Sequence, residues 1–213
     1  MLITNRLKEI NKKISSNLSL VAVSKTRNNK EILESYKSGQ LMFGENKVQE
    51  LTKKHEELPK NIQWHMIGHL QTNKVKYIAK FISLIHTVDS IKLMKEINKR
   101  AFNENRIIDC LIQIHIANEE NKFGFKIHEI NNVLDLAKDL KNINIKGLMG
   151  MGTYTDDLDI INNEFKILNS EFLKRKTFEF DTLSMGMSND YKIAIKNGST
   201  MLRLGSSIFG KRK

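Results

Sequence analysis

Eight short apolar runs, rich in β-branched residues, recur along the chain, and longer amphipathic segments separate them. The runs lack the alternating polar residues of a half-exposed strand, which indicates strands buried on both faces of a parallel sheet. The predicted strands are residues 18–24, 41–45, 62–68, 83–89, 108–116, 145–151, 180–186 and 200–205. The clearest helical segments are residues 29–39, 90–102, 127–140 and 160–176.

Eight strands alternating with helices are typical of a (β/α)8 barrel. An open, doubly wound sheet is the alternative. The barrel is favoured because the units are similarly short and no G-x-G-x-x-G motif follows the first strand. We therefore predict an α/β fold of the TIM-barrel type.

Residues 1–14 predict one further amphipathic helix ahead of the barrel. Its apolar side would carry Leu2, Ile3, Leu7, Ile10 and Ile14. No Pro- or Gly-rich linker divides the 213 residues, so we expect a single domain over residues 1–213.

The net charge of +11 raises the question of a nucleic-acid partner. The lysines are scattered beside acidic residues on predicted helices, as is typical of a solvated surface, and no specific nucleic-acid motif is present. No apolar run approaches the roughly 20 residues of a membrane span, and no signal-peptide pattern opens the chain. Cys110, the single cysteine, lies in an apolar run and excludes an internal disulfide. We expect a cytoplasmic protein without a membrane partner.

Candidate chemistry gathers where the predicted strands end, which is where barrel enzymes place their active sites. Lys25 follows the first strand, and "SMGMS" (184–188) and "RLGSS" (203–207) follow the last two. Glycines and hydroxyls in these last two loops are typical of a phosphate site. The simpler interpretation is that the glycines only permit tight turns.

Lys25 and Arg203 would face the same site. A neighbouring cation and partial burial both lower the pKa of a lysine, and a neutral amine forms Schiff bases with aldehydes. The alternatives are a surface lysine and an arginine paired with a rim carboxylate such as Glu45. Lysine, phosphate cradle and arginine together favour pyridoxal 5′-phosphate (PLP) as the ligand.

Two histidines four residues apart, His65 and His69, raise the alternative of a zinc site. His65 falls on a predicted strand, the glutamate of H-E-x-x-H is absent, and no cluster of cysteines or carboxylates completes the ligand set. We expect His65 to be a packed or pocket-lining residue and predict no metal.

Seven motifs spread over the chain resemble those of the pyridoxal phosphate homeostasis protein family. They are "AVSKT" (22–26), "FGENKVQE" (43–50), "WHMIGHLQTNK" (64–74), "HTVDS" (86–90), "GLM" (147–149), "LSMGMSND" (183–190) and "GSTMLRLGSSIFGKR" (198–212). The resemblance implies a single-domain barrel of the type found at the N-terminus of alanine racemase, with PLP as its cofactor.

The resemblance also implies roles for single residues. Lys25 would carry PLP as a Schiff base, Arg203 would face the pyridine nitrogen, and Asn46 would lie close to the ring. The phosphate would be held by Ser188, Gly205 and Ser206 and by the backbone near Met187.

The sequence departs from the family pattern at three places. Asn28 stands where a proline is common, which puts the rigidity of the loop after Lys25 in doubt. His115 replaces an asparagine after the fifth strand, and Ser206 replaces a threonine while keeping the hydroxyl.

An arginine at the pyridine nitrogen makes the ring a weaker electron sink than a carboxylate would. Alanine racemases share the arginine, but a tyrosine from a second domain supplies their second acid/base group. Here Tyr154 is the one tyrosine expected near the barrel mouth. We therefore predict a monomeric PLP carrier for PLP-dependent apoenzymes rather than an enzyme. A racemase of low activity is the alternative, and an aldolase without cofactor is a third.

Overall fold

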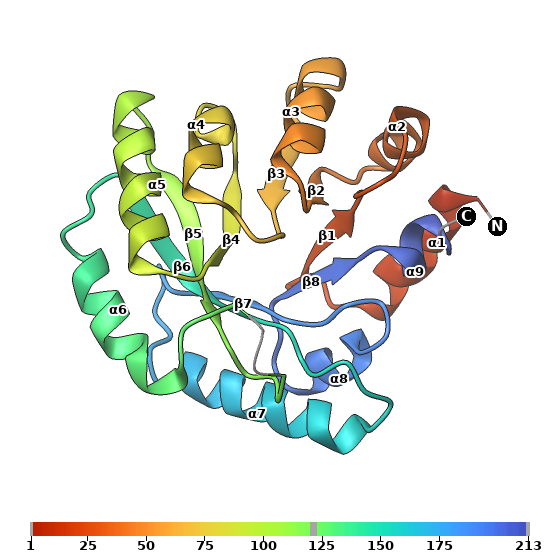
Figure 1. Ribbon diagram of the computed structural model, residues 1–213. Helices are drawn as coiled ribbons and strands as arrows, with labels where there is room; N and C mark the ends of the chain where they lie inside the picture. The colour runs from red at the N-terminus through yellow and green to blue at the C-terminus, as the bar shows by residue number, and fades with distance from the viewer. Residues whose placement is uncertain (1, 120–122, 212–213) are drawn as a thin grey trace.

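Eight parallel strands form a closed barrel in the computed structural model, which describes residues 2–119 and 123–211 (Figure 1). Each strand pairs with the next along the chain, and the last pairs with the first. The strands are β1 (Ser19–Val23), β2 (Met42–Glu45), β3 (Gln63–Met66), β4 (Leu84–Val88), β5 (Ile108–Ile114), β6 (Ile143–Gly150), β7 (Thr182–Ser184) and β8 (Met201–Leu204). The predicted (β/α)8 barrel is confirmed, and the open doubly wound sheet is excluded.

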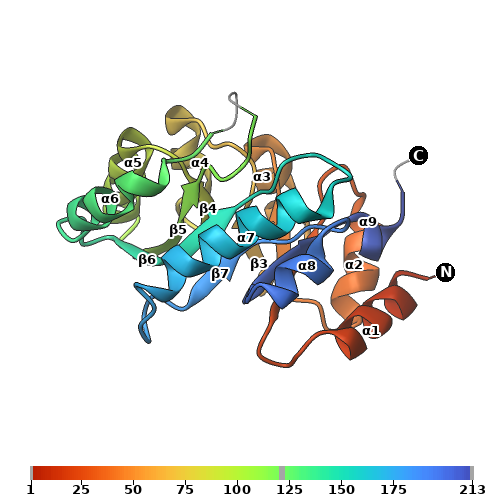
Figure 2. The same cartoon turned by 90° about the horizontal axis from the view of Figure 1, so that it is seen from below.

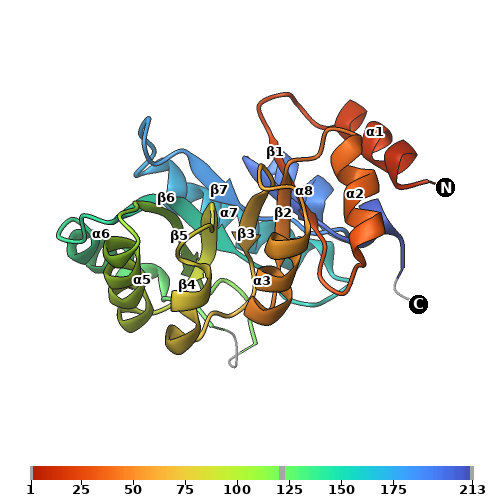
Figure 3. The same ribbon diagram turned by 90° about the horizontal axis from the view of Figure 1, so that it is seen from above.

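Helices follow the strands and cover the outside of the barrel, as the views from below and above show (Figures 2 and 3). They are α2 (Asn29–Lys37), α3 (Val48–Glu57), α4 (Val75–Ile78), α5 (Ile91–Asn103), α6 (Ile130–Ala137), α7 (Leu158–Leu173), α8 (Tyr191–Lys196) and α9 (Ser206–Phe209). Short 3-10 turns, η1 (Thr72–Lys74) and η2 (Ile127–Glu129), precede α4 and α6.

All four predicted helices have at least one boundary that differs by one to three residues from the one that periodicity predicts, and two of them differ at both ends by two residues or more. The predicted helix 160–176 begins at Leu158, because the side chain of Asp157 caps the helix by accepting from the N–H groups of Asp159 and Ile160. The predicted helix 127–140 opens as the η2 turn and continues as α6 only to Ala137.

The extra N-terminal helix is also present, as α1 (Ile3–Lys13). Its buried side carries Ile3, Leu7 and Ile10, and it packs against α2 and α9. Leu2 was expected on the same side but is exposed. The two chain ends lie on the same side of the molecule (Figure 1). Among the described residues, no helix is long and apolar enough to cross a membrane.

Alternation along each strand divides its side chains between two environments. On β1, Leu20 and Ala22 join the core between barrel and helices, whereas Val21 joins a separate apolar cluster inside the barrel. That inner cluster contains Val21, Leu84, Leu111, Met149 and Met201. Continuing the same alternation past the strand, Lys25 lies on the inner side, like Val21 and Val23.

Candidate functional site

A cavity of about 900 Å³ opens at the carboxyl ends of the strands. Its lining includes all seven residues predicted to bind the cofactor, namely Lys25, Asn46, Met187, Ser188, Arg203, Gly205 and Ser206. Segments after β1, β2, β7 and β8 therefore meet around one space, as expected for a barrel site. Their role in binding stays a prediction.

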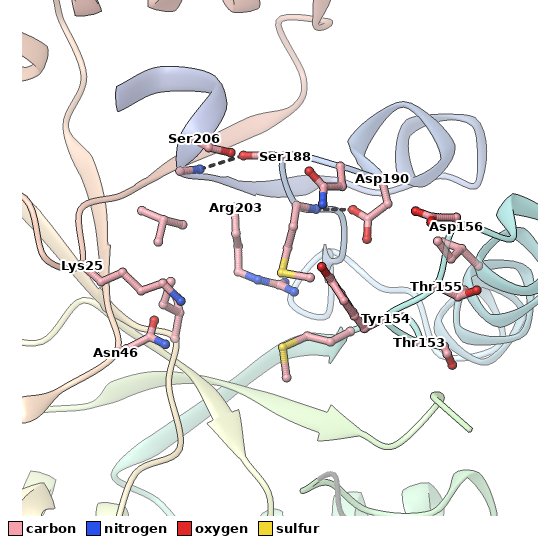
Figure 4. A pocket seen from close by; sticks show the side chains of 18 of the residues that line it. Lys25, Asn46, Thr153, Tyr154, Thr155, Asp156, Ser188, Asp190, Arg203 and Ser206 are labelled. Carbon is pink, nitrogen blue, oxygen red and sulfur yellow. Dashed lines mark hydrogen bonds between the residues drawn. The ribbon is translucent and has the colours of Figure 1, made fainter. Parts of the chain in front are cut away.

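Lys25 and Arg203 extend into the same space from different strands, and Asn46 lies beside Lys25 (Figure 4). Lys25 is half-buried, in the loop between β1 and α2. The backbone at Gly68 passes close to that of Asn46, since a Cβ on Gly68 would lie 2.4 Å from the Asn46 carbonyl oxygen. The close approach of the two backbones requires glycine there.

The loop after Lys25 is anchored without the missing proline. The Asn28 side chain accepts from the N–H of Glu31 at 3.0 Å, and the Asn28 N–H donates to Glu31 Oε2 at 3.0 Å. This capping box starts α2 and fixes the loop where it enters the helix. Arg27 adds a bond to the Gly210 carbonyl at 2.5 Å, which ties the loop to the C-terminal segment.

Arg203 is only 3% exposed and is held by neutral acceptors. Its guanidinium donates to Ser184 Oγ at 2.5 Å and to the Gly150 carbonyl at 3.0 Å. Burial lowers the pKa of Arg203 to about 10, with nearby Asp190 acting in the opposite direction, so the group stays charged at neutral pH. The alternative ion pair with Glu45 is wrong, because Glu45 points to the outer side of β2 and pairs with Lys54 at 2.8 Å.

Two buried histidines extend the chain of hydrogen bonds that begins at Arg203 and Ser184. His86 Nδ1 lies 3.0 Å from Ser184 Oγ, and His86 Nε2 lies 3.0 Å from His65 Nδ1. Because the arginine can only donate, Ser184 accepts from it, and the Ser184 hydroxyl still has a proton that can be donated to His86 Nδ1. In that arrangement His86 carries its proton on Nε2 and donates to His65 Nδ1.

Both histidines are neutral in this chain of bonds. Burial lowers the pKa of His65 to about 4. The pKa of His86 also lies well below its ordinary value, because of burial first and then the neighbouring His65 and Arg203. The interpretation of His65 as a packed residue is confirmed, whereas sequence reasoning gave His86 no role.

Ser188 offers a hydrogen-bond donor to the cavity. The N–H groups of Gly205 and Ser207 donate to its Oγ at 3.1 and 3.3 Å. These bonds use both lone pairs of the hydroxyl, so its single proton is left for an acceptor elsewhere. An anion in the cavity is such an acceptor, and Ser206 lies beside Ser188 to complete this side of the site (Figure 4).

The turn that carries Ser188 depends on a glycine and an aspartate. Gly186 has φ of +96°, and a Cβ there would lie 2.5 Å from the Cβ of Ala194. The Met187 N–H donates to Asp190 Oδ1 at 2.5 Å, so this backbone donor is already occupied in the structure. Burial raises the pKa of Asp190, and the Met187 N–H and Arg203 oppose that rise.

The opposite side of the cavity is a loop after β6 that contains Tyr154. Glu164 of α7 fixes this loop, since it accepts from the Thr153 N–H at 2.8 Å and from the Thr153 hydroxyl. Tyr154 lies at the barrel mouth, as expected, but is 91% exposed. Sequence reasoning missed Glu164, which is 6% exposed; the available signal was its place beside Ile161, Phe165 and Leu168 on the apolar face of the helix.

The remaining candidates lie elsewhere. His65 points into the barrel, whereas His69 bonds to Asp89 at 2.8 Å outside it. Within residues 2–119 and 123–211, no three His, Cys, Asp or Glu side chains cluster as metal ligands would. The His115 ring bonds to the Glu119 carbonyl at 2.9 Å, and His115 is not among the described residues that line the cavity.

A family model described as the N-terminal domain of alanine racemase matches residues 2–213. The chain belongs to this family. It is 38% identical to the pyridoxal phosphate homeostasis protein of Aquifex aeolicus (strain VF5), over 91% of this chain and 87% of that protein. The predicted resemblance to the pyridoxal phosphate homeostasis proteins is therefore confirmed.

Two solved structures share the fold. PipY of Synechococcus elongatus PCC7942 with PLP bound is 29% identical, has a TM-score of 0.88, and matches 98% of this chain and 100% of that one. An alanine racemase from Clostridium difficile 630 is 15% identical with a TM-score of 0.77. The match covers 99% of this chain but only 56% of that racemase, and it supports the fold alone.

Proposed function

We propose that this protein binds PLP and takes part in the homeostasis of PLP in the cell, with Lys25 as the residue that holds the cofactor covalently. One observation carries the proposal: an amine, a guanidinium and a hydroxyl with an unused proton, on Lys25, Arg203 and Ser188, line the same cavity. PipY, which matches nearly the whole chain, has been solved with PLP bound.

Each group of lining residues would contact a different part of PLP. The Lys25 amine would hold PLP covalently at its aldehyde carbon. Arg203 would donate to the ring nitrogen, and Asn46 would lie near the ring beside Lys25. Ser188, with Gly205, Ser206 and the segment at Met187, would hold the phosphate. When bound, PLP supplies an electron sink for reactions of amines.

The charge on Arg203 argues against enzymes that need a strong electron sink, such as aminotransferases, and the exposure of Tyr154 argues against a racemase. A charged guanidinium that donates to the ring nitrogen disfavours protonation of that nitrogen, and this weakens the electron sink. Tyr154 lines the cavity but is 91% exposed, whereas an acid/base group must be held in place to transfer a proton. The function therefore consists of holding PLP and passing it to PLP-dependent apoenzymes.

The proposal extends to the setting in which the protein acts. It would work as a monomer, one PLP-binding domain over residues 1–213, in the cytoplasm. The single buried cysteine supports a reducing compartment. Size-exclusion chromatography with light scattering tests the monomer, and a mass near twice the 24.6 kDa of the chain would contradict it.

Absorbance spectroscopy with and without added PLP tests the function. We expect a yellow band that borohydride fixes as a reduced adduct on Lys25, located by peptide mass mapping. The band and the adduct should be lost in Lys25→Ala and kept in Lys47→Ala, an exposed lysine of the neighbouring strand end. A colourless protein without an adduct on Lys25 would overturn the proposal.

A low-activity racemase is the second candidate, and the presence of Tyr154 in the cavity lining is the observation in its favour. Incubating the PLP-loaded protein with L-alanine or L-serine and analysing the chirality of the product separates the two. Formation of the D-amino acid, lost in Tyr154→Phe, would identify a racemase.

A further inference from the structure

A charged cluster lies behind the first two strands, on the side away from the cavity. It consists of Glu45 at the end of β2 and of Glu50 and Lys54 on α3. The Lys54 ammonium donates to Glu45 Oε1 at 2.8 Å and to Glu50 Oε1 at 2.6 Å. Glu45 is fully buried, and Lys54 is 5% exposed. Glu45 and Lys54 are thus paired out of water, whereas the side chain of Glu50 is 24% exposed.

This cluster forms hydrogen bonds with the residues on both sides of Lys25. On one side, Lys54 donates to the Ser24 carbonyl at 2.8 Å, and the Ser24 hydroxyl donates to Glu45 Oε1 at 2.6 Å. On the other side, the Thr26 N–H donates to Glu50 Oε1 at 2.6 Å. The backbone of Lys25 is therefore fixed from behind, while its side chain lies on the cavity side.

Thr26 has a backbone conformation that its residue type disfavours, so the surrounding contacts have to hold it. Its φ is +64°, in the left-handed region, which a β-branched residue adopts only when its surroundings hold it there. The Arg27 N–H closes this turn by donating to the Ser24 carbonyl at 2.9 Å, and the bond from the Thr26 N–H to Glu50 is the side-chain contact that holds the conformation. Such strain is characteristic of functional sites, where the surrounding structure fixes a geometry that the local sequence disfavours.

We propose that Glu50, tied to Glu45 through Lys54, is a positioning residue that holds the strained turn at Thr26 and thereby aims Lys25 into the cavity. This inference rests on the proposed role of Lys25 in PLP binding. Glu50 itself does not line the cavity among the described residues, so it acts through the backbone rather than by touching the ligand.

The test compares Glu50→Gln with the same change in a Thr26→Gly background. Gln keeps the size of the side chain and an amide oxygen that can accept from the Thr26 N–H, but it lacks the negative charge that strengthens this bond and pairs with Lys54, so the anchor is weakened. We expect PLP loading of Lys25, measured by borohydride trapping, to weaken roughly tenfold to a hundredfold. Glycine adopts positive φ without strain, so the double variant should load to within about twofold of the parent protein.

Three controls make the outcome specific. Glu56→Gln, an exposed residue of the same helix, should load like the parent. Circular dichroism and thermal melting check that Glu50→Gln folds, and Glu50→Asp, which keeps the charge on a shorter side chain, replaces it if it does not. The pH profile of the yellow band reports on Lys25 itself and should shift in Glu50→Gln but return to the parent profile in the double variant.

The outcomes separate the inference from the function on which it rests. Normal loading in Glu50→Gln, or a loss that Thr26→Gly does not rescue, overturns the positioning role while leaving PLP binding intact. Absence of a Lys25 adduct in the parent protein overturns the proposed function instead. Rescue by Thr26→Gly supports the inference, because a general loss of stability would not be repaired at one turn.

Discussion

The two neutral histidines inside the barrel predict that the protein loses stability in mild acid. Burial lowers the pKa of His65 to about 4, against an ordinary value of 6.5. The unfolded chain therefore binds a proton that the folded barrel rejects, and stability falls as pH drops from 6.5 toward 4. This difference in pKa is worth about 3 kcal/mol in full, of which about 2 kcal/mol is lost by pH 5. His86 acts with the same sign.

The variant His65→Gln isolates this contribution. The amide oxygen of glutamine can accept the proton of His86 Nε2, but the side chain does not titrate. Urea unfolding at pH 7 and pH 5 gives the free energy of unfolding, followed by the fluorescence of the single, buried Trp64. Between these pH values the variant should lose about 2 kcal/mol less than the parent.

Comparing the variant with the parent also cancels the contribution of carboxyl groups whose pKa shifts change stability in the opposite direction. The pKa values of Glu45 and Asp190 are raised by burial, so these groups favour the fold as pH falls, equally in both proteins. His128→Gln, at an exposed position, is the control and should follow the parent. Equal losses in His65→Gln and the parent would refute the neutral, buried chain of hydrogen bonds.

Three further changes test the fold around the site. Asn28→Ala removes the side-chain acceptor of the Glu31 N–H in the capping box and should cost about 1 kcal/mol in urea unfolding. Phe165→Ala empties a fully buried position between α7 and the barrel, and we expect a loss of about 3–5 kcal/mol in the same assay. Gly186→Ala forces a side chain against Ala194 at a positive φ; it should lower the melting temperature, and an unchanged value would contradict the strained turn.

The barrel could be predicted because its strands are buried on both faces. A strand covered by helices outside and by packed side chains inside reads as a continuous apolar run, and eight such runs leave few architectures. The site residues followed from the same fact. Polar groups directly after a buried strand have to lie at the rim, which places Lys25, Ser188 and Gly205 together before any coordinates are known.

Residues hidden by the pleat of a strand were harder to place. Glu45 was assigned to the rim, but Met42 packs inside the barrel and the three-residue offset to Glu45 turns its side chain outward. Counting alternate positions from the buried part of the strand would have corrected this. Lys54 was interpreted as one more surface lysine, because the helical pattern does not show that the buried carboxylate of Glu45 lies beside it.

Contacts between side chains on different strands could not be predicted from the sequence, for a different reason. His65 and His86 meet between the neighbouring strands β3 and β4, and His86 meets Ser184 of β7 across the interior of the barrel, so their separations along the chain carry no signal. A lone histidine in an apolar strand is most often a packed residue. The pattern therefore predicted the environment of His65 correctly but not its partner.

This chain of bonds bears on how Arg203 could act under the proposed function. The two acceptors that its guanidinium contacts among the described residues, the Ser184 hydroxyl and the Gly150 carbonyl, are neutral. A carboxylate in either place would share the positive charge and leave less of it for a ligand. Asp190 raises the arginine pKa from nearby, but its Oδ1 accepts from the Met187 N–H. A buried arginine fixed by uncharged partners keeps its charge for the cavity, as a group that must donate to a ring nitrogen requires.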